Sequence, residues 1–425
     1  MLSASVHRLC WAARRQCQRA PPRPADRILV LSAASQSRWA STKSETATAT
    51  PKRRRKKTDT LPQPSVNLPA PEKWAESFNV KLSTKPLSGR ISVSNPETAD
   101  KLANAFVPEG SKDKVIVEAY PGPGQLTRSL LKLPRERIKK IVLMEPIPGF
   151  LEWLKPLEEL DDRISVMAVD PWIWSSYDEL QEAGHLADVP ILDWNAGVHP
   201  TLHFIQHLPS IVLGEQLLNQ YIRTIPDQHW LYKYGRIPLD MVISARMLQR
   251  LTATTQDTNQ RGKLGVFREA TSVVTTPVPP SELDPYDEHF YPVRKASTSN
   301  ASKALEDRKA GNPHLALRIM ALDEPLIKPK TLETWDYVTR KLFISKATPV
   351  SKSIQTLAPG ANAILKYLTD PDLPAEQQLD VSKRPQELTV HEWALIVNAF
   401  DKWPFRPKHL GIDVDLITTG KIARK

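Results

Sequence analysis

The sequence predicts an α/β protein in which a doubly wound parallel sheet precedes a smaller helical domain. From about residue 90, short apolar segments alternate with amphipathic segments of helical length, a pattern typical of βαβ units with parallel strands. A glycine-rich turn follows the first of these apolar segments, and doubly wound sheets bind their ligands at such carboxyl ends of strands. After about residue 330 the strand pattern stops and apolar residues recur every three or four positions, which indicates helices.

The individual elements follow from the same two periodicities. In the sheet domain the predicted order is helix 96–106, strand 114–119, helix 124–133, strand 138–144, helix 149–160, strand 164–168, strand 202–205, helix 214–224, helix 239–252, strand 263–267 and strand 315–320. In the helical domain, helices are predicted at 331–343, 350–357, 361–368 and 389–400. No stretch approaches the ~18 apolar residues of a membrane span, and nothing indicates a coiled coil, so we expect a monomer without a membrane partner.

The 425 residues are long enough for two domains and additional tails. The expected order is a transit peptide at 1–40, a disordered basic and Pro-rich linker at 41–88, a sheet domain at 89–330 with a polar surface insertion at about 285–312, and a helical domain with a C-terminal tail at 331–425.

Residues 1–40 contain seven arginines, a single acid and no long apolar run. This composition is typical of a mitochondrial transit peptide, and the alternative is a disordered basic tail. We therefore expect a protein of the mitochondrial matrix. Cys10 and Cys17 are the only cysteines and both lie in this segment, so the mature chain should have neither a disulfide nor a thiolate metal site.

Positive charge is concentrated before the folded part. Residues 1–57 hold 14 Lys and Arg against two acids, whereas the rest of the chain holds 44 basic and 45 acidic residues. The net charge of +11 is therefore no argument that the folded part binds nucleic acid. The run PKRRRKK at 51–57 fits a nonspecific phosphate contact, a nuclear localisation signal or a solvated segment.

Three features stand at the ends of successive predicted strands. Gly122 and Gly124 lie in the turn after the first strand, where backbone amides can approach a ligand at a helix N-terminus. Glu145 ends the second strand, where a carboxylate can accept both hydroxyl hydrogens of a ribose. Asp170 ends the third, where it can accept from an adenine amino group. Together they predict an adenosyl ligand, and the alternative is an ordinary tight turn with surface acids.

The order of these motifs resembles that of the class I methyltransferases that dimethylate adenine in small-subunit ribosomal RNA. VIVEAYPGPGQLT resembles their cofactor loop, IVLMEP their acidic strand end and VMAVDPW their third motif, and the similarity extends over roughly residues 90–375. It implies a class I methyltransferase-like fold and an S-adenosyl-L-methionine site, functional or vestigial. The residues that the resemblance assigns to this site are Glu118, Gly122, Gly124, Glu145 and Asp170.

Within this group, the segments AYPG, DPWIWSSY and WLYKYGRIPLDM are similar to those of fungal mitochondrial transcription factors. These factors act as specificity subunits of the single-subunit mitochondrial RNA polymerase. The resemblance implies a mitochondrial RNA polymerase as partner, together with promoter DNA, ribosomal RNA or both.

The catalytic motif of the methylases, Asn-Leu-Pro-aromatic after the fourth strand, is altered here. His207 stands in place of the Asn, Pro209 is retained, and Ser210 replaces the aromatic residue. An imidazole nitrogen accepts a hydrogen bond only when it is unprotonated, and a hydroxymethyl group cannot clamp a flipped base. We therefore expect His207 and Pro209 to mark a degenerate, inactive catalytic motif.

Aromatic and basic residues gathered near strand ends and loops indicate contacts with unpaired bases, which stack on aromatic rings for ~1–3 kcal/mol per base. The alternative for each ring is packing in the core. The candidates are Trp174, Tyr177, Lys233, Tyr234 and Arg236.

These patterns favour a noncatalytic initiation factor that confers promoter recognition or melting on the mitochondrial polymerase. Two other hypotheses stay open. One is an S-adenosylmethionine-dependent dimethyltransferase of mitochondrial small-subunit ribosomal RNA, and the other is an assembly factor that binds ribosomal RNA by shape.

Overall fold

The computed structural model describes residues 67–78, 89–293 and 312–410. The chain divides into two compact units, Met1–Asp59 and Thr60–Lys425, and every described residue belongs to the second. The predicted transit peptide and the basic run at 51–57 lie outside the described residues. None of the helices in the described ranges has both the length and the apolarity that crossing a bilayer requires.

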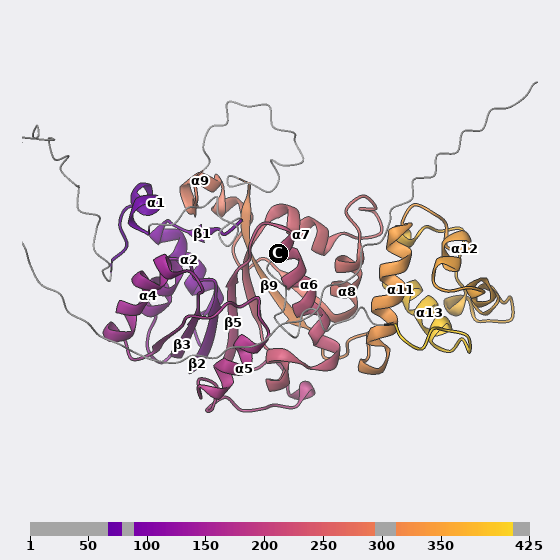
Figure 1. The fold of residues 1–425 in the computed structure, drawn as a ribbon, viewed down its shortest axis with the longest axis horizontal. Helices are drawn as coiled ribbons and strands as arrows, with labels where there is room; N and C mark the ends of the chain where they lie inside the picture. Colours follow the sequence, from indigo (N-terminus) through magenta and orange to yellow (C-terminus); the bar gives the residue numbers. More distant parts are fainter. Residues whose placement is uncertain (1–66, 79–88, 294–311, 411–425) are drawn as a thin grey trace, which may run out of the picture. The chain divides into compact units, whose positions relative to one another are not determined.

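A seven-stranded sheet organises the larger part of the fold (Figure 1). The strand order is β4-β3-β2-β5-β6-β9-β7, in which the first five strands are parallel and β9 runs antiparallel to both of its neighbours. The strands are β2 (Lys114–Ala119), β3 (Ile138–Met144), β4 (Ile164–Met167), β5 (Leu202–His207), β6 (Leu239–Ser244), β7 (Ser272–Thr275) and β9 (His314–Ala321). This is the predicted class I methyltransferase-like, doubly wound arrangement.

Helices cover both faces of this sheet, because strands such as β2 have apolar side chains on both sides. Val115 and Val117 pack into one apolar cluster and Ile116 into the other, as the two-residue period of a strand requires. The helices are α2 (Pro96–Phe106), α3 (Gln125–Lys132), α4 (Pro148–Leu160), α5 (Ser175–Glu182), α6 (Val212–Asp227), α7 (Ala245–Thr252) and α8 (Lys263–Thr271).

Two predicted elements of the sheet domain were wrong. Residues 239–252, predicted as one helix, form strand β6 followed directly by helix α7. All six residues of β6 are buried between β5 and β9, so pairing within the sheet overrides the apolar spacing that looked helical. Ser244 then begins the helix, since its hydroxyl accepts from the Met247 amide at 3.4 Å.

The segment 263–267, predicted as a strand, belongs to helix α8. Leu264, Val266, Phe267 and Ala270 of this helix are all buried. A short apolar run does not reveal by itself whether it lies in a buried strand or a buried helix. The edge strand β7 follows the helix at once.

A helical region follows β9 and contains α11 (Leu332–Ile344), α12 (Val350–Ser353) and α13 (Val390–Asp401). The predicted helices at 331–343 and 389–400 agree with α11 and α13 to within one residue. Those predicted at 350–357 and 361–368 are a single α-turn and 3₁₀ segments (Ile354–Thr356 and Ala361–Tyr367). Helices α11 and α13 contact α8, and their buried residues share one apolar cluster with the sheet.

The predicted linker at 41–88 was wrong for residues 67–78. Pro71–Lys73 and Trp74–Ser77 (α1) form a short helical segment that packs against α4. Trp74 and Phe78 are each 1% exposed, and the Phe78 ring lies 5.5 Å from that of Trp153. These two aromatic residues provide the apolar surface that stabilises an otherwise polar and Pro-rich segment.

The predicted surface insertion at about 285–312 begins later than expected. Tyr286–His289 forms α9, and strand β8 (Phe290–Tyr291) pairs antiparallel with β1 (Ser92–Val93). Tyr286 and Phe290 are buried in the cluster under α2 and α3, which anchors this turn to the core. Residues 294–311 lie outside the described residues.

Candidate functional site

The loop after β2 has a backbone that suits glycine at three positions, yet one of them is Tyr120. Tyr120, Gly122 and Gly124 have φ values of +57°, +63° and +86°. A Cβ on Gly122 would lie 2.3 Å from the Ser92 hydroxyl, and one on Gly124 would lie 2.5 Å from Leu154. The loop is therefore tightly packed by β1 on one side and α4 on the other.

Glu145 ends β3 beneath this loop and is completely buried. Its Oε1 accepts from the Ile147 amide at 3.1 Å and from Arg90 Nη1 at 3.2 Å. Its Oε2 accepts from the Gly122 amide at 3.1 Å and from Arg90 Nη2 at 2.5 Å. Burial raises the pKa of Glu145, and the charge and hydrogen bonds of Arg90 oppose that rise.

Arg90, 5% exposed, comes from the segment just before β1. Its guanidinium carbon lies 4.2 Å from the centroid of the Tyr120 ring and 5.9 Å from that of Phe150. A planar guanidinium can pair with a carboxylate through two hydrogen bonds and stack on rings at the same time. The N-terminal part of the described chain thus delivers a cation onto the acid that ends β3.

Tyr120 connects this ion pair to the third strand end. Its hydroxyl donates to Asp170 Oδ1 at 2.5 Å, and the same oxygen accepts from the Trp172 amide at 2.9 Å. Burial and the neighbouring Asp170 raise the pKa of Tyr120 well above its usual value, so the hydroxyl stays protonated. Asp170 itself lies beyond the end of β4 and is half-buried.

Glu118 lies near the end of β2 and faces the helix that follows. It is completely buried and accepts from the Thr127 hydroxyl at 2.7 Å. Burial raises its pKa to about 7, and the nearby Glu145 contributes to that rise. Glu118 therefore fixes the start of α3 from below the loop and has no exposed surface.

These residues do not fit an adenosyl cofactor as they stand. A carboxylate offers about four lone-pair positions, and Glu145 uses four hydrogen bonds from Arg90, Ile147 and Gly122. None is left for the two hydroxyl hydrogens of a ribose. The predicted set Glu118, Gly122, Gly124, Glu145 and Asp170 is brought together at one edge of the sheet, but Arg90 and the ring of Tyr120 lie among them.

The loop after β5 holds the predicted degenerate motif. His207 is 2% exposed, and its ring lies in the interior beside the Tyr120 backbone. Burial lowers the pKa of His207 to about 3, with the charge of Arg90 as the next cause, so the ring is neutral at physiological pH. Ser210 is also buried, and its hydroxyl donates to the Gly89 carbonyl at 3.3 Å.

Pro209 lies between these two residues and sets the start of α6. A Cβ on Gly214 would lie 1.8 Å from the Pro209 carbonyl oxygen, so the loop and the helix are in direct backbone contact. The His207 ring lies in the interior, and the Ser210 hydroxyl is directed to the Gly89 carbonyl.

The predicted platform for bases is only partly at the surface. Tyr177 and Tyr234 are 6% and 5% exposed, so the prediction that they stack on bases was wrong: both rings pack in the core. Arg236 donates to the carbonyls of Trp194 and Ala321 and thereby connects the segment before β5 to the end of β9. The joint occurrence of aromatic and basic residues did not distinguish core rings from exposed ones.

Trp174 and Lys233 are the accessible members of that set. Trp174 is half-buried at the rim of an aromatic cluster, 6.2 Å from the ring of Trp230. Lys233 is exposed and donates to the side chain of Gln181. Trp174 follows the carboxyl end of β4, whereas Lys233 lies between α6 and β6 and contacts the end of α5 through Gln181.

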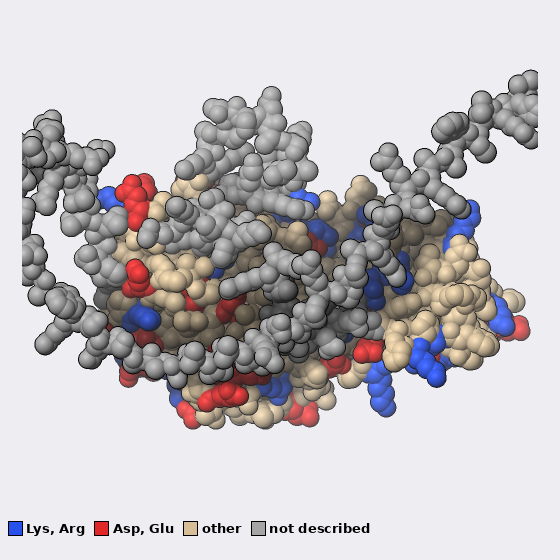
Figure 2. Space-filling view, viewed as in Figure 1, with Lys and Arg blue, Asp and Glu red and all other residues tan. Residues whose placement is uncertain are grey.

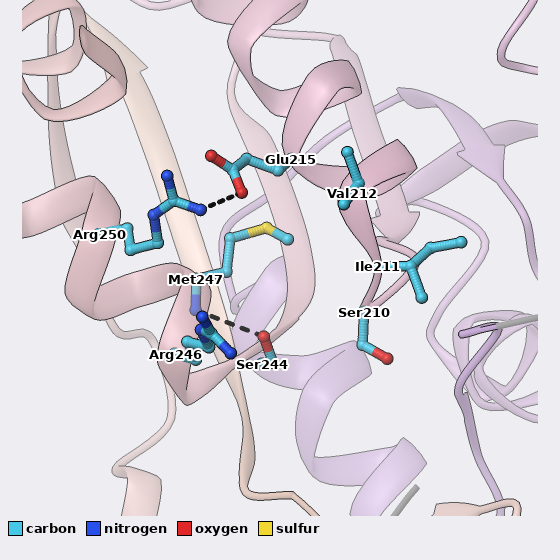
Figure 3. A pocket seen from close by; sticks show the side chains of 8 residues that line it. All are labelled: Ser210, Ile211, Val212, Glu215, Ser244, Arg246, Met247 and Arg250. Carbon is cyan, nitrogen blue, oxygen red and sulfur yellow. Dashed lines mark hydrogen bonds and ion pairs between the residues drawn. The ribbon is translucent and has the colours of Figure 1, made fainter. Parts of the chain in front are cut away.

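Two adjoining cavities that sequence reasoning missed lie at the carboxyl ends of β5 and β6. The first is small, with a volume of about 40 Å³, and it is open to solvent (Figure 3). Its lining residues are Ser210, Ile211, Val212, Glu215, Ser244, Arg246, Met247 and Arg250. Arg250 forms an ion pair with Glu215. These two residues and Val212 line both cavities.

The second cavity, of about 270 Å³, extends along α6 to Lys263 at the start of α8. Beyond it, Asp336 of α11 is approached by three cations, Lys263, Arg223 at 3.7 Å and Arg340 at 3.9 Å. Figure 2 shows basic side chains gathered over α7 and between α8 and α11. The sequence did contain an indication of this basic surface, because Arg246 and Arg250 lie one helical turn apart in the helix that was predicted at 239–252.

The model of the ribosomal RNA adenine dimethylase family matches residues 89–394, which is most of the chain. The chain belongs to this family. The matched range covers the whole seven-stranded sheet and the helical region as far as Ala394 in α13. Within this fold, the chain therefore has two unusual features. The motif at His207–Ser210 is altered, and the hydrogen-bond acceptor positions of the Glu145 carboxylate are filled by the protein itself.

Relatives within the family are of two kinds. The chain is 25% identical to mitochondrial transcription factor 1 of Lachancea kluyveri, over 69% of this chain and 82% of that protein. It is 24% identical to mitochondrial transcription factor 1 of Saccharomyces cerevisiae, over 75% and 89%. It is also 24% identical to a mitochondrial dimethyladenosine transferase 1 of Vermamoeba vermiformis, over 70% and 84%.

Among solved structures, the 23S rRNA methyltransferase ErmE is similar to this family member with a TM-score of 0.43 and 15% identity. The similarity covers 73% of this chain and 99% of that structure.

Proposed function

We propose that this chain is a mitochondrial transcription initiation factor, which binds promoter DNA for a mitochondrial RNA polymerase and does not methylate RNA. Two of the relatives above are named mitochondrial transcription factor 1, and they align over more than four fifths of their own length. Residence in the mitochondrial matrix is part of the proposal, because relatives of both kinds are named mitochondrial.

The observation that carries the proposal is the state of the β5 loop. A methylase of adenine amino groups has to position the base with hydrogen-bond acceptors and a stacking ring. Here His207 is buried beside the Tyr120 backbone, and Ser210 donates to the Gly89 carbonyl. A loop whose polar groups face inward supplies neither acceptor nor platform to a flipped base.

The surface that we assign to DNA consists of the two cavities and the cations around them. Arg246 and Arg250 of α7 lie on the first cavity, and Lys263 lies on the second. Cations placed along a groove neutralise successive phosphates, while the apolar lining from Val212 and Met247 offers contact to bases. Trp174, at the rim of the aromatic cluster, and Lys233 add a second contact region for an unpaired strand.

Transcription with the cognate mitochondrial RNA polymerase on a promoter template tests the proposal. We expect the full chain to support initiation, and we expect Arg246→Ala with Arg250→Ala to weaken binding to a pre-melted promoter about tenfold or more while reducing the salt dependence of binding. The matched control is Arg135→Ala with Lys139→Ala, since these exposed cations lie at the amino end of β3. Equal losses in both double variants would contradict the assigned surface.

The alternative function is dimethylation of adenines in mitochondrial small-subunit ribosomal RNA. Family membership and the name of the Vermamoeba relative favour it. Methyl transfer to a small-subunit hairpin by the unmodified chain, above that of an Asp170→Ala variant, would establish this alternative. We expect no transfer, and none after His207→Asn with Ser210→Tyr, because Arg90 and Tyr120 still lie in the cofactor region.

A further inference from the structure

We propose that Arg90 is an internal ligand, which together with the Tyr120 side chain occupies the adenosyl site, and that replacing these two residues opens the site to adenosyl nucleosides. The inference goes beyond the role in transcription, because a protein that has lost methyl transfer could still bind the cofactor. It concerns the carboxyl edge of β2, β3 and β4.

The first step of the argument is the hydrogen bonding of Glu145. Two backbone amides, from Gly122 and Ile147, hold its carboxylate in place. The two remaining lone-pair positions receive the guanidinium of Arg90 at 3.2 and 2.5 Å. A ribose offers two hydroxyl donors to a carboxylate, so Arg90 supplies the same number of donors at the same acceptor.

The second step is the stacking. The guanidinium lies 4.2 Å from the centroid of the Tyr120 ring, which in turn donates its hydroxyl to Asp170 at 2.5 Å. Glu145 and Asp170 are the two acids expected to bind the ribose and the adenine. Both therefore have a hydrogen-bond donor that belongs to the protein, and the side chains carrying these donors stack on each other.

The third step is the backbone. Tyr120 adopts φ +57°, a conformation that is strained for any residue with a Cβ and is usually left to glycine. The strain persists because Arg90 packs on one face of the ring and Asp170 accepts from its hydroxyl. A glycine at this position would adopt the same backbone without strain and would remove the ring from the site.

The fourth step is the origin of Arg90. It lies next to β1, which pairs with β8, and Ser92 of β1 packs against Gly122 of the loop. The internal ligand is therefore held by a strand on one side and by an ion pair on the other. The position of Arg90 therefore depends on the packing of β1 against the loop as well as on the ion pair with Glu145.

Calorimetry of the full chain with S-adenosylhomocysteine, a stable adenosyl nucleoside, tests the inference. We expect no binding by the unmodified chain and a Kd below about 0.1 mM for Arg90→Ala with Tyr120→Gly. The melting temperature of this double variant should also rise with ligand concentration. Micromolar binding by the unmodified chain would overturn the inference, and so would absence of binding by a correctly folded double variant.

A matched control separates opening of the site from general loosening. Arg318 pairs with the buried Asp240 at 2.8 and 2.6 Å on another strand, so Arg318→Ala removes a comparable ion pair away from the site. We expect it to lower stability without creating binding. Binding by Arg318→Ala at the strength of the double variant would contradict a specific role for Arg90.

If Arg90→Ala with Tyr120→Gly does not fold, Arg90→Lys with Tyr120→Gly replaces it. A lysine keeps a positive charge beside Glu145, but its single ammonium cannot cover both oxygens of the carboxylate. We expect weaker binding than with alanine, but binding that calorimetry still detects, in contrast to the unmodified chain. Absence of binding by this folded variant would likewise overturn the inference. A negative result in these calorimetric experiments would not contradict the proposed role in transcription, because promoter binding is measured in a separate assay.

Discussion

His207 makes the stability of the fold depend on pH. Its pKa is lowered from 6.5 to about 3, because burial disfavours the charged ring. A lowered pKa means that the unfolded chain binds the proton more tightly than the folded one. The stabilising contribution is therefore fully present above pH 6.5 and is lost as the pH falls toward 3. His314, whose pKa is lowered to about 4 by burial, acts in the same direction.

We expect His207→Leu to reduce this acid sensitivity, since leucine has no proton to gain. The difference between the melting temperatures at pH 7 and pH 4.5 should be smaller in the variant than in the unmodified chain. His391→Leu is the control, because His391 is exposed on α13. An unchanged difference for His207→Leu would show that His207 does not contribute to the acid transition.

For single residues, the sequence predicted where the candidate site residues lie in the fold better than it predicted which side chains surround them. The spacing of Gly124, Glu145 and Asp170 placed them at successive strand ends, and the structure brings them to one edge of the sheet. Arg90 could not be predicted, because it is 55 residues away from Glu145 in the chain and lies in a segment without a strong pattern. The burial of Tyr177 could not be predicted either, because helix α5, which buries it, was not among the predicted elements.

Among the elements, the helical segment at 71–77 is stabilised almost entirely by aromatic contacts. Trp74 packs at 5.3 Å from the ring of Phe78 and at 5.1 Å from that of Tyr291, and its indole donates to the Pro69 carbonyl. Isolated segments of this length have little helical stability of their own. The free energy that keeps the segment in place must therefore come from packing.

Trp74→Ala should detach this segment from α4. Truncation of a buried Trp costs about 3–5 kcal/mol when the rest of the protein stays in place, and here the loss is limited to the docking energy of the segment. We expect faster proteolysis between residues 67 and 90, with little change in the protection of the sheet. Lys73→Ala, in the same segment but exposed, serves as the control. Slow cleavage in both variants would mean that other contacts hold the segment.

The elements that were predicted correctly have unambiguous periodicity. Strands β2 and β3 and helix α2 have the predicted bounds, because their apolar residues repeat consistently and their ends carry turn residues. Strand β6 was predicted as part of a helix, because the polar Asp240 within an apolar segment made that segment resemble an amphipathic helix. That carboxylate is paired with Arg318 and with His203 at 2.7 Å, and such long-range partners are absent from any local window.

For the whole molecule, Arg261 joins the sheet domain to the helical region. Its side chain is 1% exposed and donates to the carbonyls of Ala253 and Leu388 at 2.8 and 3.0 Å. Leu388 directly precedes helix α13. A cation at this position satisfies carbonyl groups from segments that are more than a hundred residues apart, within one continuous apolar cluster.

We expect Arg261→Met to loosen the helical region more than the sheet. Methionine fills similar space but leaves both carbonyls without a donor, at a cost of about 1–3 kcal/mol for each. Hydrogen exchange should become faster in α13 while β5 keeps its protection. The control is Arg384→Ala, because the half-exposed side chain of Arg384 pairs with Glu387 three residues away. Equal acceleration in α13 and β5 would instead indicate that the whole fold opens as one unit.

The pairing of Arg90 with Glu145 also bears on how the protein responds to metabolism. An external cofactor occupies its site according to its supply, and it stabilises the fold only while it is abundant. A ligand that belongs to the same chain has a high and constant effective concentration, set by the covalent connection alone. The abundance and working life of this protein should therefore stay the same whether the cell is rich or poor in methyl donors.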